Sequence, residues 1–191
     1  MVLISIVIGI GITNLLSGVA RAFEVAAKDI RQLGNAKIYF AWVLQSFVWM
    51  ACFWWYQVAL INDITWTLPR YFLELAYAVA LFLMTAILSP RANSDTVDFD
   101  AYFISQRRWF FLAYLLTTLI DVTETLSNGG FGHLMEIGWV TNIGMLGAVV
   151  LAILCIRFPN RKFQFAMSIV LLTWLVASFF ETVPALIEAK G

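Results

Sequence analysis

Acidic side chains stand inside long apolar segments of this sequence. Asp121 lies within one such segment, and Glu124 follows one helical turn later on the same side. A carboxylate inside hydrocarbon is costly and by default indicates a function, such as binding a cation or carrying a proton. The candidates for such an ion pathway or proton site are Asp121, Glu124, Glu74 and Glu181.

Asp121 is expected to lie deep in a membrane. At a rise of about 1.5 Å per residue it is about 20 Å along a helix from Arg108, the expected cytoplasmic edge of a hydrocarbon core about 30 Å thick. The other three acids are expected in the same outer third of the bundle, where they would form an acidic vestibule that attracts cations. In the simpler alternative these acids are hydrated groups near helix ends, with Arg70 as the partner of Glu74.

The first apolar block carries a face of small and polar residues. Gly11, Asn14 and Gly18 lie close to one side of a helix. Small residues let another backbone approach, so we expect helix packing at Gly11 and Gly18, within the bundle or between copies in a homo-oligomer. Asn14 either hydrogen-bonds across that contact or lines a polar path toward the cytoplasm with Gln45 and Ser46.

His133 is the single histidine, in an expected outer loop that begins at Asn128. One imidazole near carboxylates could bind a divalent metal or sense pH, but the spacing fits no metal motif, and a solvated loop histidine is the simpler interpretation. Cys52 and Cys155 have no CxxC partner and are interpreted as packing residues. Without a phosphate loop or a nucleophile elbow, we expect neither enzymatic activity nor a cofactor.

The composition requires a membrane. Of 191 residues, 62% are hydrophobic and 13% charged, and the mean hydropathy is +0.85. A soluble domain would have too little polar surface to cover such a core. Zero net charge and two cysteines exclude a nucleic-acid partner and a disulfide scaffold, and the apolar content excludes disorder.

The apolar residues gather in blocks separated by turn formers and charges. Each block is about long enough to cross a membrane as a helix and is about twice the length of a barrel strand. We predict an all-α polytopic bundle that contacts membrane lipids and forms one transmembrane domain over 1–191. Its six spans are expected near 2–20, 38–61, 71–89, 109–126, 138–156 and 163–183.

Two connections on the cytoplasmic side have helical patterns of their own. Over 20–33, apolar residues such as Phe23 recur every three or four positions, so the first helix is expected to continue as an amphipathic stretch. After the third span, Asp98 or Ser94 could cap a short interfacial helix that leads into the fourth span. Both segments brace the bundle or bind a protein partner.

Four strings of aromatic and polar residues stand out in about the first two thirds of the chain. They are Asn14-Leu15-Leu16-Ser17-Gly18, Phe53-Trp54-Trp55, Ala101-Tyr102-Phe103 and Gln106-Arg107-Arg108-Trp109-Phe110-Phe111. Together they resemble a group of small bacterial inner-membrane proteins with six helices. The resemblance implies a multi-pass protein of the bacterial inner membrane and transfers neither an activity nor a site residue.

Two functions fit these patterns. The first is an oligomeric cation or proton channel or transporter that uses the outer acidic vestibule. The alternative is a non-catalytic accessory or sensor subunit that binds a partner through the cytoplasmic amphipathic segments. The two differ in whether a polar path crosses the bundle.

The distribution of basic residues predicts the orientation. Ten of the twelve Lys and Arg residues fall in or beside the connections after the first, third and fifth spans. Basic loops stay in the cytoplasm, so both termini are expected outside it. Cysteine labelling or reporter fusions should place 21–37, 91–108 and 157–162 in the cytoplasm. Labelling of any of these segments from outside intact cells would reverse the arrangement.

Overall fold

A computed structural model of the chain describes residues 2–28, 36–60, 67–90, 98–136 and 139–188. Within these ranges it contains helices and short connections and no strand. The helices are α1 (Val2–Lys28), α3 (Lys37–Leu60), α4 (Leu68–Leu88), α5 (Phe99–Glu136), α6 (Trp139–Arg157) and α7 (Arg161–Glu188). The predicted all-α architecture is confirmed.

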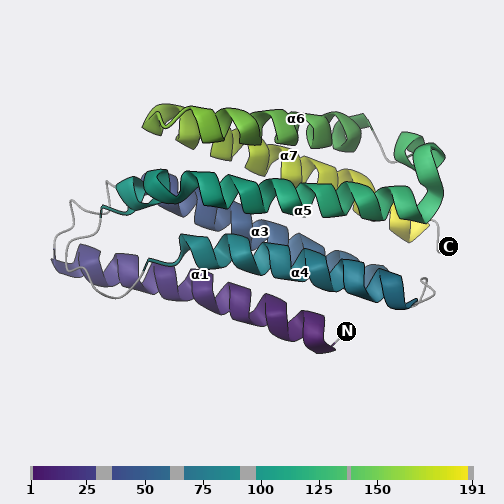
Figure 1. Ribbon diagram of the computed structural model, residues 1–191, viewed down its shortest axis with the longest axis horizontal. Helices are drawn as coiled ribbons and strands as arrows, with labels where there is room; N and C mark the ends of the chain where they lie inside the picture. Colours follow the sequence, from purple (N-terminus) through teal and green to yellow (C-terminus); the bar gives the residue numbers. More distant parts are fainter. Residues whose placement is uncertain (1, 29–35, 61–66, 91–97, 137–138, 189–191) are drawn as a thin grey trace.

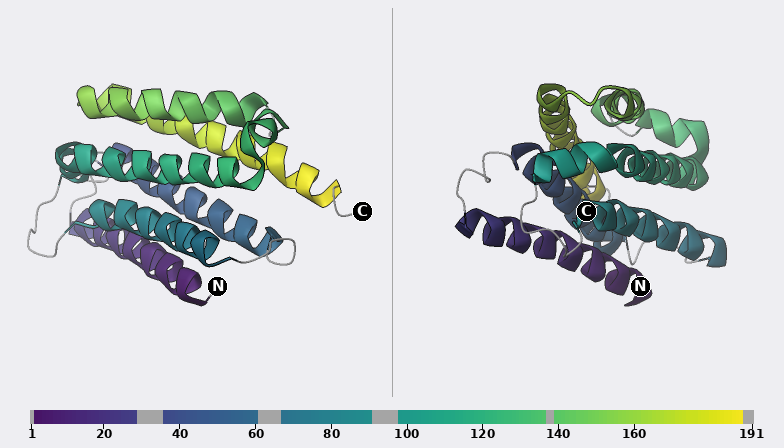
Figure 2. Two further views of the ribbon diagram at one scale, coloured as in Figure 1. Left: turned by 45° about the vertical axis from the view of Figure 1, so that its right-hand side comes forward. Right: turned by 60° about the vertical axis from the view of Figure 1, so that its left-hand side comes forward.

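Consecutive helices run antiparallel, and the bundle has three layers (Figures 1 and 2). The middle layer contains α3 and α5, with α1 and α4 on one side and α6 and α7 on the other. The helices α3, α4 and α5 contact one another, α1 packs against α3 and α4, and α7 packs against α3. The start of α1 and the end of α7 lie at the same end of the bundle.

Five of the described helices are long and apolar enough to cross a membrane; α6, apolar over Thr141–Arg157, is slightly shorter. The outward faces are apolar as well: Leu119 is 63% exposed, Leu146 74% and Phe180 69%. Such exposure of large apolar side chains is typical of a surface that contacts lipid. The side of the membrane on which the termini lie stays a prediction.

Helix ends follow local sequence signals. Pro69 lies in the first turn of α4, where its missing N–H costs little, and Pro90 follows the last turn. Asp98 Oδ1 accepts the Ala101 N–H at 2.9 Å and so caps α5, as expected, whereas Ser94 lies outside the described residues. Asn160 Oδ1 accepts the Lys162 N–H at 2.9 Å at the start of α7.

The prediction for the fourth span was wrong at both ends. The expected interfacial helix and the span 109–126 form one continuous helix, and the expected loop from Asn128 is helical through Glu136. Two adjacent glycines cost about 1 kcal/mol each in a helix, which is too little to end it. The last turns of α5 bend toward α6 (Figure 1).

The first helix continues beyond its span, as expected, as far as Lys28; residues 29–33 lie outside the described ranges. Its inward face differs from the prediction. Ala22, Val25 and Ala26 are buried against the bundle, while Phe23 is 57% exposed.

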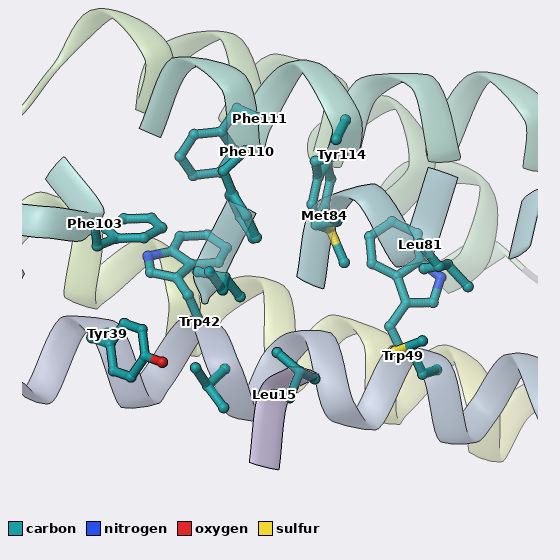
Figure 3. Close-up of a cluster of buried hydrophobic side chains, with 14 of the residues drawn as sticks. Leu15, Tyr39, Trp42, Trp49, Leu81, Met84, Phe103, Phe110, Phe111 and Tyr114 are labelled. Carbon is teal, nitrogen blue, oxygen red and sulfur yellow. The ribbon is translucent and has the colours of Figure 1, made fainter. Parts of the chain in front are cut away.

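An aromatic cluster holds α3 against α5 (Figure 3). The fully buried indole of Trp42 stacks on Phe103 with ring centroids 5.7 Å apart and meets Phe110 and Phe111 edge-on at 5.4 and 4.9 Å. Edge-to-face and offset pairs of this kind add about 0.5–1.5 kcal/mol each beyond their buried area. The start of α3 is therefore fixed relative to the start of α5.

A second contact joins the same two helices. Asp100, in the first turn of α5, accepts the backbone N–H groups of Ile38 and Tyr39 through Oδ1 at 2.9 and 3.0 Å. These N–H groups belong to the first turn of α3 and have no partner within their own helix. The cap of α3 therefore comes from another helix.

The small-residue face of α1 packs inside the bundle. A Cβ on Gly18 would overlap the Tyr39 hydroxyl, and one on Gly11 would overlap the Met50 side chain. Of the two alternatives for this face, packing within the bundle is confirmed, because α3 and α4 of the same chain occupy it. Whether the protein forms a homo-oligomer stays a prediction. Gly9, on the other side of α1, has open space around it.

Bulk on the inward face of α1 should therefore destabilise the single chain. We expect Gly18→Leu to lower the free energy of unfolding by about 1–3 kcal/mol, because the added side chain must displace Tyr39. Gly9→Leu is the matched control and should stay within about 0.5 kcal/mol of wild type. Thermal or denaturant unfolding in detergent measures both. Equal effects of the two substitutions would contradict this packing.

Candidate functional site

Carboxyl groups from two helices meet inside the bundle, at the end where α3 and α5 finish and α4 begins. Glu74 of α4 is 1% exposed and Glu124 of α5 is 5% exposed, whereas Asp121 is half-buried. Gln57 of α3 donates a hydrogen bond from Nε2 to Glu74 Oε2. Three helices thus bring polar side chains to one interior position.

Glu74 and Glu124 lie close enough for their carboxyl groups to interact electrostatically. Arg70 Nη2 lies 3.8 Å from Glu124 Oε1, which is within ion-pair range but beyond a hydrogen bond. The pair is partly shielded, with the side chains of Arg70 and Glu124 20% and 7% exposed.

Tyr77 lies on the cavity wall with Asp121 and is hydrogen-bonded to α3. Trp49 Nε1 donates to the Tyr77 hydroxyl at 3.1 Å. Tyr77 is buried against Phe53, with ring centroids 4.7 Å apart. A tyrosine beside Asp121 is thus fixed in position by an indole and a phenyl ring of α3.

A partly open cavity of about 160 Å³ lies beside these acids. Asp121 and Glu124 both line it, together with Thr125 of the same helix. The remaining described residues that line it come from α3, α4, α6 and α7: Trp49, Cys52, Phe53, Tyr56, Tyr77, Thr141, Met145, Trp174, Leu175, Ser178 and Phe179.

Two other predicted site residues lie elsewhere. Glu181 Oε2 accepts the backbone N–H and the hydroxyl of Thr141 at 3.2 and 2.9 Å, so this carboxylate caps the first turn of α6. Asn14 is half-buried in α1, and its backbone carbonyl accepts a hydrogen bond from the Ser89 hydroxyl at 2.9 Å. The structure therefore brings together Asp121, Glu124 and Glu74 but not Glu181 or Asn14.

The other two residues of the expected polar path, Gln45 and Ser46, differ in their hydrogen bonding. Ser46 donates its hydroxyl to the Trp42 carbonyl at 2.8 Å in the same helix. Gln45 is completely buried, and neither atom of its amide has a hydrogen-bond partner among the described residues. The interior polarity along α3 therefore extends beyond the cavity.

His133 lies in the last turns of α5, but its side chain is outside the described part of the structure. Within that part, no three His, Cys, Asp or Glu side chains are grouped so that they could hold a metal ion. The metal hypothesis for His133 thus stays a prediction.

Basic residues gather at the opposite end of the bundle, where α1 and α6 finish and α3, α5 and α7 begin. There Arg161 Nη2 pairs with Asp98 Oδ2 at 2.8 Å. Burial raises the pKa of Asp98, but hydrogen bonds donated by the Ala101 N–H and Arg161 lower it more, and the pKa lies below its ordinary value. Asp98 is therefore a paired surface acid, unlike the interior ones.

No family model, curated protein or solved structure matches the chain.

Sequence reasoning missed most of the cavity wall and assigned the wrong partner to Arg70. The expected pair of Arg70 with Glu74 is replaced by Arg70 with Glu124, because Gln57 occupies Glu74. The sequence does contain a signal that could have found part of this wall. Arg70, Glu74 and Tyr77 recur at intervals of four and three on α4, which places them on one face of the helix.

The ion pair at this site can be tested by a double-mutant cycle. Arg70→Met should lower the free energy of unfolding by about 1–3 kcal/mol, because it leaves Glu124 buried without a cation. Combining it with Glu124→Gln should recover part of that loss, since the unpaired charge is gone. The exposed pair of Asp98 and Arg161 is the control and should show a coupling energy below about 1 kcal/mol. Additive effects at Arg70 and Glu124 would show that they do not interact.

Proposed function

We propose that this protein is an integral membrane protein that binds a monovalent cation or protons at the interior acids and moves them through the bundle. The observation that carries the proposal is the excess of acid beside the cavity. Three carboxyl groups gather there, those of Glu74, Glu124 and Asp121, and among the described residues Arg70 is the one basic residue paired with them. Acids that outnumber their basic partners inside a helix bundle need a cation or a proton as a further partner.

The position of the site supports transport rather than a structural role. Asp121 and Glu124 line a partly open cavity, so a cation can reach them without unfolding the helices. Structural acids in this chain look different: Glu181 and Asp100 each accept two hydrogen bonds at the first turn of another helix. The acids at the cavity cap no helix.

One chain contains the whole site. Its acids come from α4 and α5 of the same bundle, and the glycine face once expected between copies is occupied. The proposal therefore does not depend on a homo-oligomer. We place the protein in the bacterial inner membrane on the resemblance of its sequence, with the cavity end of the bundle outside the cytoplasm, because the basic connections lie at the other end.

The decisive measurement is ion flux into proteoliposomes that contain purified protein. Asp121→Asn keeps the shape and removes the charge, so it should lower the flux of protons, Na⁺ or K⁺ by about tenfold or change its pH dependence. Asp98→Asn, at the basic end, is the control and should leave flux unchanged. Both variants should keep the helical content and the unfolding midpoint near those of wild type.

Two results would contradict the proposal. Wild-type proteoliposomes that pass none of these ions faster than empty liposomes would favour the accessory or sensor alternative. Flux per folded protein that is unaffected by Asp121→Asn, together with a lower unfolding midpoint, would make Asp121 a structural acid.

A further inference from the structure

The wall of the cavity is largely aromatic. Of the fourteen described residues that line it, six carry aromatic rings, and they come from three helices. The faces of such rings carry partial negative charge and attract cations. The rings belong to Trp49, Phe53 and Tyr56 of α3, Tyr77 of α4, and Trp174 and Phe179 of α7.

Several of these rings are held in place by their neighbours. Tyr77 is packed against Phe53 and accepts the hydrogen bond of Trp49. The indole of Trp174 lies directly against the α6 backbone, where a Cβ on Gly144 would overlap it. A wall that is fixed before binding loses little side-chain entropy when a ligand enters.

The charged groups at the cavity carry one sign. Asp121 and Glu124 line it, and none of the described residues on its wall is basic. Glu124 is 5% exposed, yet its Oε1 has no hydrogen-bond donor among the described residues, and Arg70 Nη2 stays 3.8 Å away. This buried oxygen therefore has acceptor capacity that the described residues do not use.

We propose that the cavity binds a small organic cation with a methylated ammonium group, and this inference rests on the proposed function of the same acids. The rings would contact the methyl groups by cation–π attraction, and the carboxylates would balance the charge. A methylated ammonium is weakly hydrated and makes no demand for oxygen ligands, whereas inorganic cations prefer a shell of oxygens. A wall with six aromatic residues supplies the ring contacts that the former can use.

The size of the cavity limits the ligand. A protein cavity of about 150 Å³ accommodates benzene, so a space of about 160 Å³ accommodates a head group of similar bulk. The trimethylammonium group of choline meets this limit. Cations that carry several aryl groups exceed it.

Isothermal titration of the full-length protein in lipid nanodiscs tests the inference. The probe is choline, and its neutral control is dimethylbutanol, in which a tert-butyl group replaces trimethylammonium. We expect choline to bind at least about tenfold more tightly than dimethylbutanol, because shape and apolar surface are the same and only the charge differs.

Substitutions in the cavity wall and on the outer surface of the bundle should differ in their effect on choline binding. Tyr56→Leu should weaken choline binding by about tenfold, while Trp55→Leu, which changes the neighbouring aromatic residue on the exposed side of α3, should leave it unchanged. Glu124→Gln, which keeps the shape of the side chain, should also weaken it. Unfolding midpoints measured in parallel identify any variant that fails to fold.

The outcomes distinguish the two proposals. Equal binding of choline and dimethylbutanol, or no choline binding to folded wild type, overturns the organic ligand. If flux of protons, Na⁺ or K⁺ still depends on Asp121 in that case, the proposed function stands without the organic ligand. If neither binding nor flux is seen, both proposals fail.

Discussion

The position of α3 depends on the packing of Trp42. Apolar side chains gain nothing by leaving lipid for protein, so helices in a bilayer associate through close contact and hydrogen bonds. The Trp42 indole supplies that contact against Phe103, Phe110 and Phe111, and Gly18 lets Tyr39 approach α1 on the other side. With α3 held in this way, its far end reaches the acids of α4 and α5. The part of the cavity wall that α3 provides depends on that placement.

The sequence was sufficient for the elements of the fold. Apolar length predicted where the helices lie, but it missed both ends of α5. The segment before 109 was interpreted as a separate interfacial helix, and Gly129 and Gly130 were interpreted as a loop, although a glycine pair costs too little to end a helix that other contacts favour. Spacing placed Asp121 and Glu124 on one face, and the alternation of helices directed Glu74 to the same end. Which acid would meet Arg70 depends on the rotation of each helix about its axis, and hydropathy carries no information about that rotation.

The acids show how position decides role in one chain. Asp100 and Glu181 accept backbone N–H groups and complete helices, Asp98 forms a surface pair, and Asp121 and Glu124 border a cavity. By residue type alone the five are equivalent. The distinguishing feature is whether the carboxylate accepts hydrogen bonds at the start of a helix, as Asp98, Asp100 and Glu181 do, or lines a cavity, as Asp121 and Glu124 do.

The cap that Asp100 provides for α3 also sets an order of assembly. The acceptor for the Ile38 N–H lies 62 residues further along the chain, so it does not yet exist when α3 is first made. Synthesis proceeds from the N-terminus, and water at the membrane surface must serve those N–H groups until α5 arrives. The same helix brings Asp121 and Glu124. A nascent chain that has not inserted α5 therefore carries no acidic cavity, and the last step in closing the central helices is also the step that creates its charge.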